Sequence, residues 1–105
     1  MKRRILRRVA AKRDLIQHFA FIGERDPAAA VEFRESAERA FRLLAEMPEI
    51  GALKRFRNSK LESLRMWAIK GFPDRLVFYK VHERAIEVIR VLHAREDFRR
   101  VLGPE

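Results

Sequence analysis

Residues 64–102 constrain the fold more than any other part of the chain. They are dense in β-branched and aromatic residues, which predicts three consecutive strands near residues 64–69, 75–82 and 85–92. Residues 71–74 (Gly-Phe-Pro-Asp) predict the turn between the first two strands, because glycine permits positive φ and proline presets its own φ. A charged and mostly polar tail follows, for which we expect a short helix at 95–102.

The last predicted strand alternates in a way that indicates two faces. Ile86, Val88, Arg90 and Leu92 form one set, and Ala85, Glu87, Ile89 and Val91 form the other. The second set is apolar apart from Glu87, whereas the first carries Arg90 among aliphatic residues. This pattern indicates a sheet packed on helices, with a partly polar opposite face.

Two helical patterns precede these strands. The first stripe contains Ala11, Leu15, His18, Phe19 and Ile22, and the second contains Ala30, Phe33, Ala37, Ala40, Phe41, Leu44 and Met47. Asp26 is expected to cap the second helix, with Pro27 as its first residue and Pro48 beyond its end.

A short first strand is expected at residues 4–9, so the predicted order is β-α-α-β-β-β. The 105 residues suffice for a single α+β domain, 1–105, with a helical hairpin at about 11–47 and a four-stranded, mainly antiparallel sheet completed at about 62–93.

Composition narrows the classes of function. Cysteine is absent, which excludes a disulfide scaffold, thiol catalysis and cysteine-based metal sites, and it suits a cytoplasmic protein. No signal peptide or membrane span is expected.

The net charge of +9 is compatible with a polyanionic partner and equally with a solvated basic surface. Residues 54–60 carry Lys54, Arg55, Arg57 and Lys60 around Phe56, a pattern that fits nucleic-acid contact but is more typical of a solvated loop.

Several short motifs in this order resemble the RelE/ParE superfamily of type II toxins. They are Ala11-x-x-Asp14-Leu15, Pro27-Ala28-Ala29-Ala30, Met47-Pro48-x-x-Gly51, Leu64-Arg65-x-Trp67, Gly71-Phe72-Pro73, Leu76-Val77-Phe78-Tyr79-Lys80-Val81 and Ile86-Glu87-Val88-Ile89-Arg90-Val91-Leu92-His93-Ala94-Arg95. The resemblance spans nearly the whole chain and is closest to the ParE, or plasmid-stabilisation, branch.

This resemblance implies two antiparallel helices against a four-stranded sheet, and a growth-inhibiting toxin held inactive by a small antitoxin encoded beside it. ParE-like members block DNA gyrase and have no known catalytic site, whereas RelE-like members cut messenger RNA in the ribosome. The expected antitoxin binds DNA and carries an acidic, disordered arm that folds over the helical hairpin and the sheet edge, in a toxin–antitoxin hetero-oligomer.

The chain has only part of the set of active-site residues that RelE-like nucleases carry. Arg95 lies where RelE-like enzymes can carry an arginine, but their strand arginine aligns with Leu76, and the neighbouring Arg75 should project to the opposite face. Their C-terminal tyrosine aligns near Val101, and the only tyrosine, Tyr79, lies in mid-strand and is expected in the core.

These departures favour binding over cleavage, with no catalytic residues, no metal site and no cofactor. The predicted partner contacts are Arg65, Trp67, Arg90, His93, Arg95 and Phe98. The alternative is a ribosome-dependent mRNA interferase with a variant site, in which His93 acts as general acid or base beside Arg65, Arg90 and Arg95. For His93 itself, a strand-end residue bonded to the backbone is the more typical interpretation. A third possibility is a small basic nucleic-acid-binding module.

Overall fold

The structure is a computed structural model that describes residues 2–54 and 63–102. Its elements are β1 (Arg4–Arg7), α1 (Val9–Arg25), α2 (Pro27–Glu46), β2 (Ala52–Leu53), β3 (Arg65–Ile69), β4 (Phe72–Val81), β5 (Ala85–His93) and α3 (Phe98–Leu102). The predicted order of helices and strands is confirmed. Over the described residues the sheet has five strands, however, because the two-residue β2 adds an edge strand to the four that were expected.

The strand order across the sheet is β1-β5-β4-β3-β2. β1 runs parallel to β5, and every other neighbouring pair is antiparallel. The parallel pair is possible because the whole α1–α2 hairpin and β2–β4 separate β1 from β5 in the chain.

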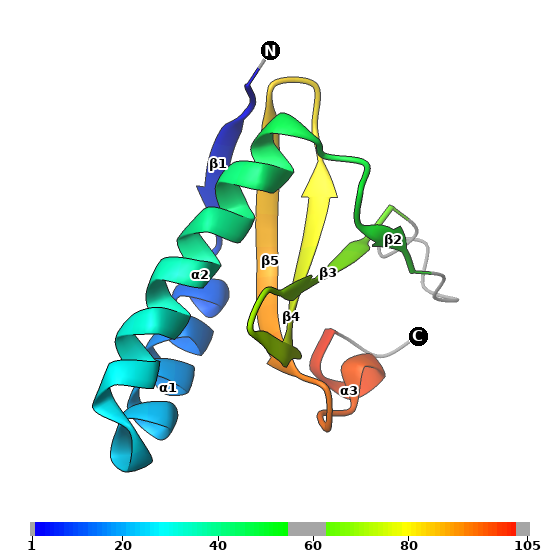
Figure 1. The fold of residues 1–105 in the computed structure, drawn as a ribbon. Coiled ribbons are helices and arrows are strands. Elements are labelled where there is room, and N and C mark those ends of the chain that lie inside the picture. Colours follow the sequence, from blue (N-terminus) through cyan, green and yellow to red (C-terminus); the bar gives the residue numbers. More distant parts are fainter. Residues whose placement is uncertain (1, 55–62, 103–105) are drawn as a thin grey trace.

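The helical hairpin forms as its sequence predicts. The Asp26 carboxylate accepts a hydrogen bond from the Ala29 N–H at 3.1 Å, and Pro27 opens α2 at a position where no intrahelical donor is needed. Asp26 is extended (φ −148°, ψ 92°), which separates α1 from α2 within one residue. The two helices therefore fold back on each other along one face of the sheet (Figure 1).

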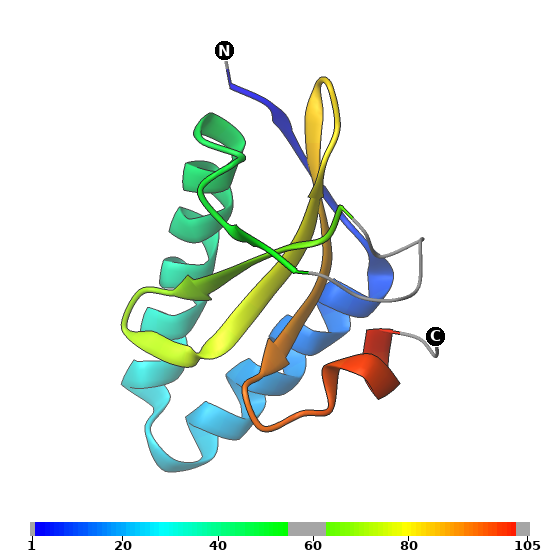
Figure 2. The same ribbon diagram turned by 90° about the vertical axis from the view of Figure 1, so that its right-hand side faces the viewer.

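Hydrophobic residues lie on both faces of the sheet. The main core lies between the sheet and the α1–α2 hairpin and is centred on Phe33, Phe41, Leu44, Val77 and Tyr79, all fully buried. A smaller cluster on the opposite face contains Leu64, Leu76, Phe78, Ile89 and Leu92, and α3 covers it (Figure 2). The opposite face thus carries a second apolar layer over part of its area. Lys80 and Glu87, which are paired across β4 and β5, lie on the same face, so it is also partly polar, as expected.

A bulge explains why the predicted alternation of β5 is wrong from Arg90 onward. Phe78 pairs with Arg90 and the next residue, Tyr79, pairs with Val88, so Ile89 has no partner in β4. The extra residue shifts every following side chain by one face. Val91 consequently joins Val88 in the main core, while Ile89 and Leu92 belong to the second cluster.

The turn between β3 and β4 is shorter than predicted. It consists of Lys70 and Gly71, whose φ of 86° suits glycine, and β4 already begins at Phe72. Phe72 pairs with Ile69, but the next pair joins Leu76 to Ala68, so residues 73–75 bulge from the ladder. Pro73, which has no N–H to donate, is tolerated in a strand at such a place.

Candidate functional site

β5 extends beyond its neighbour β1, and α1 completes the exposed edge. β1 ends at Arg7, which pairs with Val88. Three residues later, the Val91 N–H donates to the Asp14 carboxylate at 2.9 Å, and the Val91 carbonyl accepts from His18 Nε2 at 2.8 Å. Asp14 and His18 are one helical turn apart on α1 and therefore face the same way. Two side chains of α1 thus take the place of a missing strand.

Asp14 also forms an ion pair with Arg90. The Arg90 Nε and Nη2 atoms donate to the two carboxylate oxygens at 2.7 and 2.8 Å, in a bidentate arrangement. The hydrogen bond to Asp14 raises the pKa of Arg90. Because the Asp14 side chain is only 7% exposed, the pair joins α1 to β5 inside the protein. Arg90, predicted as a contact residue, is held in this structural pair.

His18 receives a second contact from Arg75. The Arg75 Nε–H donates to His18 Nδ1 at 3.3 Å, so the imidazole donates from Nε2 and accepts at Nδ1. Burial lowers the pKa of His18, and the charge of Arg75 lowers it further, so the ring is neutral near pH 7. Arg75 lies on the helix side, opposite Leu76, as the sequence predicts.

The sequence interpretation missed this cluster of Asp14, His18, Arg75 and Arg90. One signal was present, because Asp14 and His18 lie in or beside the apolar stripe of α1 and are spaced by four residues. Their partners on β4 and β5 depend on tertiary packing and carry no local signal.

His93 and Arg95 lie at the end of β5. His93 Nδ1 accepts a hydrogen bond from the Arg95 backbone N–H at 3.0 Å, and the His93 N–H donates to the Glu96 carboxylate at 3.0 Å. The other ring nitrogen lies 3.6 Å from the Asp74 carboxylate. This is the geometry of a strand-end histidine bonded to the backbone. The exposed Arg95 side chain has no hydrogen-bonded partner among the described residues.

Arg65 is distant from that end of the sheet. It pairs with Tyr79 on β4, whereas His93 pairs with Arg75, four residues earlier in β4. At about 3.3 Å per residue the two positions are roughly 13 Å apart along the strand. Arg65 Nη1 donates instead to the carbonyls of Glu49 and Gly51, at 3.1 and 2.8 Å. The four residues of the alternative nuclease site are therefore not brought together.

The two predicted aromatic contacts take part in internal packing. Trp67 is partly buried against the main core. Phe98 is partly buried in the second cluster, with its ring centroid 4.9 Å from that of Phe78. Of the basic segment 54–60, only Lys54 is described, and its N–H donates to the Leu64 carbonyl at 2.8 Å. Arg55, Phe56, Arg57 and Lys60 lie outside the described residues.

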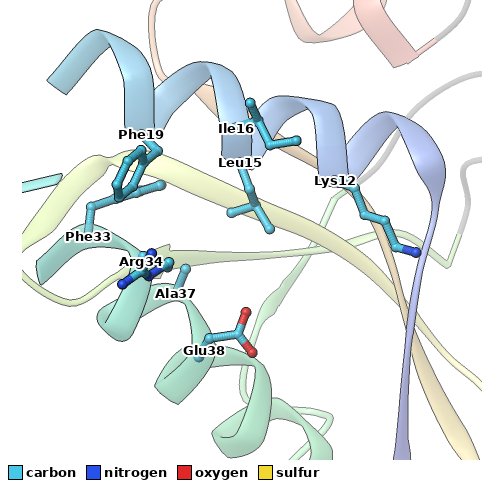
Figure 3. A pocket seen from close by; sticks show the side chains of 8 residues that line it. All are labelled: Lys12, Leu15, Ile16, Phe19, Phe33, Arg34, Ala37 and Glu38. Atoms are coloured by element: carbon cyan, nitrogen blue, oxygen red, sulfur yellow. The ribbon is translucent and has the colours of Figure 1, made fainter. Parts of the chain in front are cut away.

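The outer surface of the hairpin carries an apolar groove that the sequence interpretation did not identify. It has a volume of about 350 Å³, and Figure 3 shows the side chains of Lys12, Leu15, Ile16, Phe19, Phe33, Arg34, Ala37 and Glu38 around it. Ile16 is 68% exposed, which is unusual for isoleucine on an ordered helix. Phe21, five residues further along α1 and outside the groove lining, is 65% exposed. The hairpin therefore presents apolar surface outward as well as inward.

Within residues 2–54 and 63–102, no group of three or more His, Cys, Asp or Glu side chains is arranged to hold a metal ion. No helix in this part of the chain is long and apolar enough to cross a membrane.

The fold is that of a known class of small α+β proteins. It is similar to a solved structure described as "Chromosomal ParDE TA system from P. aeruginosa", with a TM-score of 0.70, 15% identity, and coverage of 88% of this chain and 96% of that one. At this identity the likeness shows the fold alone. A search of curated proteins found no match.

The sequence itself identifies the family. The family described as "ParE toxin of type II toxin-antitoxin system, parDE" matches residues 5–98. The chain therefore belongs to the ParE toxin family, within the RelE/ParE superfamily, as the sequence motifs predicted.

Proposed function

We propose that this toxin stops growth by binding DNA gyrase, without a catalytic site of its own, and that a cognate antitoxin neutralises it in the cytoplasm. The observation that carries the proposal is the apolar cluster on the sheet face opposite the hairpin. Leu76 and Val101 stand where RelE-like nucleases would have an arginine and a tyrosine, and both pack in the second hydrophobic cluster. Phe98 and Leu102 of α3 cover the same face.

RNA cleavage requires cations around the developing phosphorane charge and groups that transfer protons. On this chain the candidate cations Arg65 and Arg90 are bound to backbone carbonyls and to Asp14, respectively. Binding a phosphate would compete with these contacts, and the Asp14 carboxylate already offsets the charge of Arg90. Binding by surface complementarity involves no such competition.

Induced expression in cells without an antitoxin tests the target. We expect DNA synthesis to stop first, a reporter plasmid to lose negative supercoils, and messenger RNA to stay intact. Early arrest of translation with messenger RNA cut within codons, while supercoiling is unchanged, would instead establish the mRNA interferase. Normal growth and intact supercoiling at high expression would contradict both.

The groove of the hairpin is the proposed docking site for the antitoxin. An acidic, disordered arm that folds into an amphipathic helix would place apolar side chains on Leu15, Ile16 and Phe19, and carboxylates near Lys12 and Arg34 at the rim. The affinity would come mainly from the buried apolar anchors, and the charge of +9 would speed association.

Ile16→Asp tests this docking site, and Gln17→Asp is the matched control because it adds the same charge to an exposed neighbour that does not line the groove. Losing an isoleucine anchor costs about 1.5–3 kcal/mol, which corresponds to a roughly 10- to 100-fold weaker complex. We expect Ile16→Asp to stay folded and toxic but to escape the antitoxin encoded in the adjacent reading frame. Equal neutralisation of both variants would refute the docking site.

A further inference from the structure

A second surface, at the N-terminal end of the sheet, is concave and strongly basic. Lys2, Arg3, Arg4, Glu83 and Arg84 line a groove of about 700 Å³ between the start of β1 and the loop joining β4 to β5. Figure 1 shows this loop beside the chain's N-terminus, at the top of the molecule. We call the four cations Lys2, Arg3, Arg4 and Arg84 the N-terminal basic cluster.

Backbone hydrogen bonds fix the cluster in place. The Arg4 N–H donates to the Arg84 carbonyl at 2.9 Å, which joins the two segments although they are 80 residues apart in the chain. The Arg3 N–H donates to the Ala45 carbonyl at 2.9 Å, and Arg3 Nε donates to the His82 carbonyl at 3.0 Å. The cations therefore belong to a defined surface.

Carboxylates neutralise the neighbouring arginines but not the cations of this cluster. Arg7 pairs with Glu38 and Arg8 with Glu87, in each case by direct hydrogen bonds. Within residues 2–54 and 63–102, no carboxylate lies within ion-pair distance of Lys2, Arg3, Arg4 or Arg84. Glu83 supplies the only negative charge in the groove lining. Concentrating like charges in this way costs stability and favours a polyanionic partner.

The lining also indicates which polyanion fits. All five lining residues are charged, so the groove offers none of the buried apolar anchors on which protein interfaces depend. Phosphodiester backbones, in contrast, are bound through arginine and lysine contacts alone, and the arginine fork can donate two hydrogen bonds to one phosphate. The apolar groove of the hairpin shares no lining residue with this one.

We infer that the N-terminal basic cluster binds the phosphate backbone of duplex DNA, and that the toxin contacts the DNA held by its target as well as the target protein. This inference rests on the proposed function, because gyrase acts on duplex DNA. Contacts to phosphates position a protein without reading sequence, so the binding has no base preference.

Fluorescence anisotropy with a labelled duplex of mixed sequence tests the DNA contact on the full-length protein, made by cell-free synthesis. Four phosphate contacts predict a slope of log K against log salt of about −3 to −4, or a loss of roughly 100-fold between about 50 and 200 mM salt. The double variant Arg4→Glu/Arg84→Glu should reduce the magnitude of the slope by about 2 and weaken binding at low salt at least about tenfold.

The matched control is Arg13→Glu/Arg25→Glu, two exposed arginines of α1 outside the groove. Both double variants change the net charge from +9 to +5 (9 − 4 = 5). The control should bind DNA nearly as well as the unmodified protein. Equal losses in the two variants would show that only total charge matters and would overturn the inference. Tighter binding to polyglutamate or to an RNA duplex than to DNA would also overturn it.

A supercoiling assay with purified gyrase separates this inference from the proposed function. We expect Arg4→Glu/Arg84→Glu to inhibit gyrase at least about tenfold less well than the control, with the difference shrinking as salt rises. Full inhibition by this variant would overturn the DNA contact and leave the gyrase proposal standing. DNA binding through the cluster by a protein that does not inhibit gyrase would overturn the proposed function.

Discussion

Replacing Asp14 with alanine removes three contacts that join α1 to the sheet. The carboxylate binds Arg90 through two hydrogen bonds of 2.7 and 2.8 Å and accepts the Val91 N–H at 2.9 Å. Asp14 is 5% exposed, so water does not readily replace these contacts. The variant leaves the Val91 N–H without an acceptor and Arg90 without a counter-ion.

The cost follows from the exposure of each group. Removing one partner of a fully buried ion pair costs about 3–5 kcal/mol. The Arg90 side chain is 25% exposed and can turn toward water, which reduces that figure. The orphaned Val91 N–H adds about 1–3 kcal/mol. We therefore expect Asp14→Ala to lower the free energy of unfolding by about 3 kcal/mol, a large part of the roughly 5–15 kcal/mol of a small domain.

Urea unfolding followed by circular dichroism measures this change, and the control is Glu24→Ala, an exposed carboxylate on the same helix. The control should change stability by less than about 0.5 kcal/mol. A double-mutant cycle with Arg90→Ala should give a coupling of about 1–3 kcal/mol. A loss below about 1 kcal/mol for Asp14→Ala, or a cycle without coupling, would refute the argument that this pair fastens α1 to β5.

Two further predictions concern the buried polar groups. Burial lowers the pKa of His18 in the folded protein. Below about pH 6.5, the ordinary pKa of histidine, the unfolded chain therefore binds more protons at this position than the folded protein does. The stability that neutral His18 contributes is therefore complete above about pH 6.5 and is lost as the pH falls. The free energy of unfolding should fall as the pH is lowered from 7.5 to 5.5, and it should fall less in His18→Gln than in the unmodified protein. Equal pH dependence in the two proteins would contradict this prediction. Gly51→Ala should cost at least about 1 kcal/mol, because the new Cβ would lie 2.7 Å from Tyr79 Cε1 and would disturb the buried hydroxyl that binds Gly51 and Pro48. Gly71→Asn, at a positive φ in open space, should cost less when both variants are compared by urea unfolding.

The elements with strong local signals were predictable from the sequence. Asp26 and Pro27 mark the start of α2 by a capping preference that acts within four residues, and the structure has this cap. The strands near residues 64–92 follow from dense β-branched and aromatic residues. Tyr79 was expected in the core and is fully buried. In each case the determining interaction is local or depends only on hydrophobicity.

Other features depend on contacts between distant segments. The bulge at Ile89 interrupts a perfect alternation, and nothing in the local sequence marks it. Arg90 appeared as a surface cation, because its partner Asp14 lies 76 residues away. Likewise, the basic cluster arises only when parallel pairing brings Arg4 beside Arg84.

The supercoiling reaction of purified gyrase on relaxed plasmid tests the central claim most directly. The full-length toxin should inhibit supercoiling and stabilise cleaved DNA, and adding the antitoxin should reverse both effects. In a parallel reaction with programmed ribosomes, the messenger RNA should stay intact. Uninhibited supercoiling together with ribosome-dependent cleavage of messenger RNA would contradict the account.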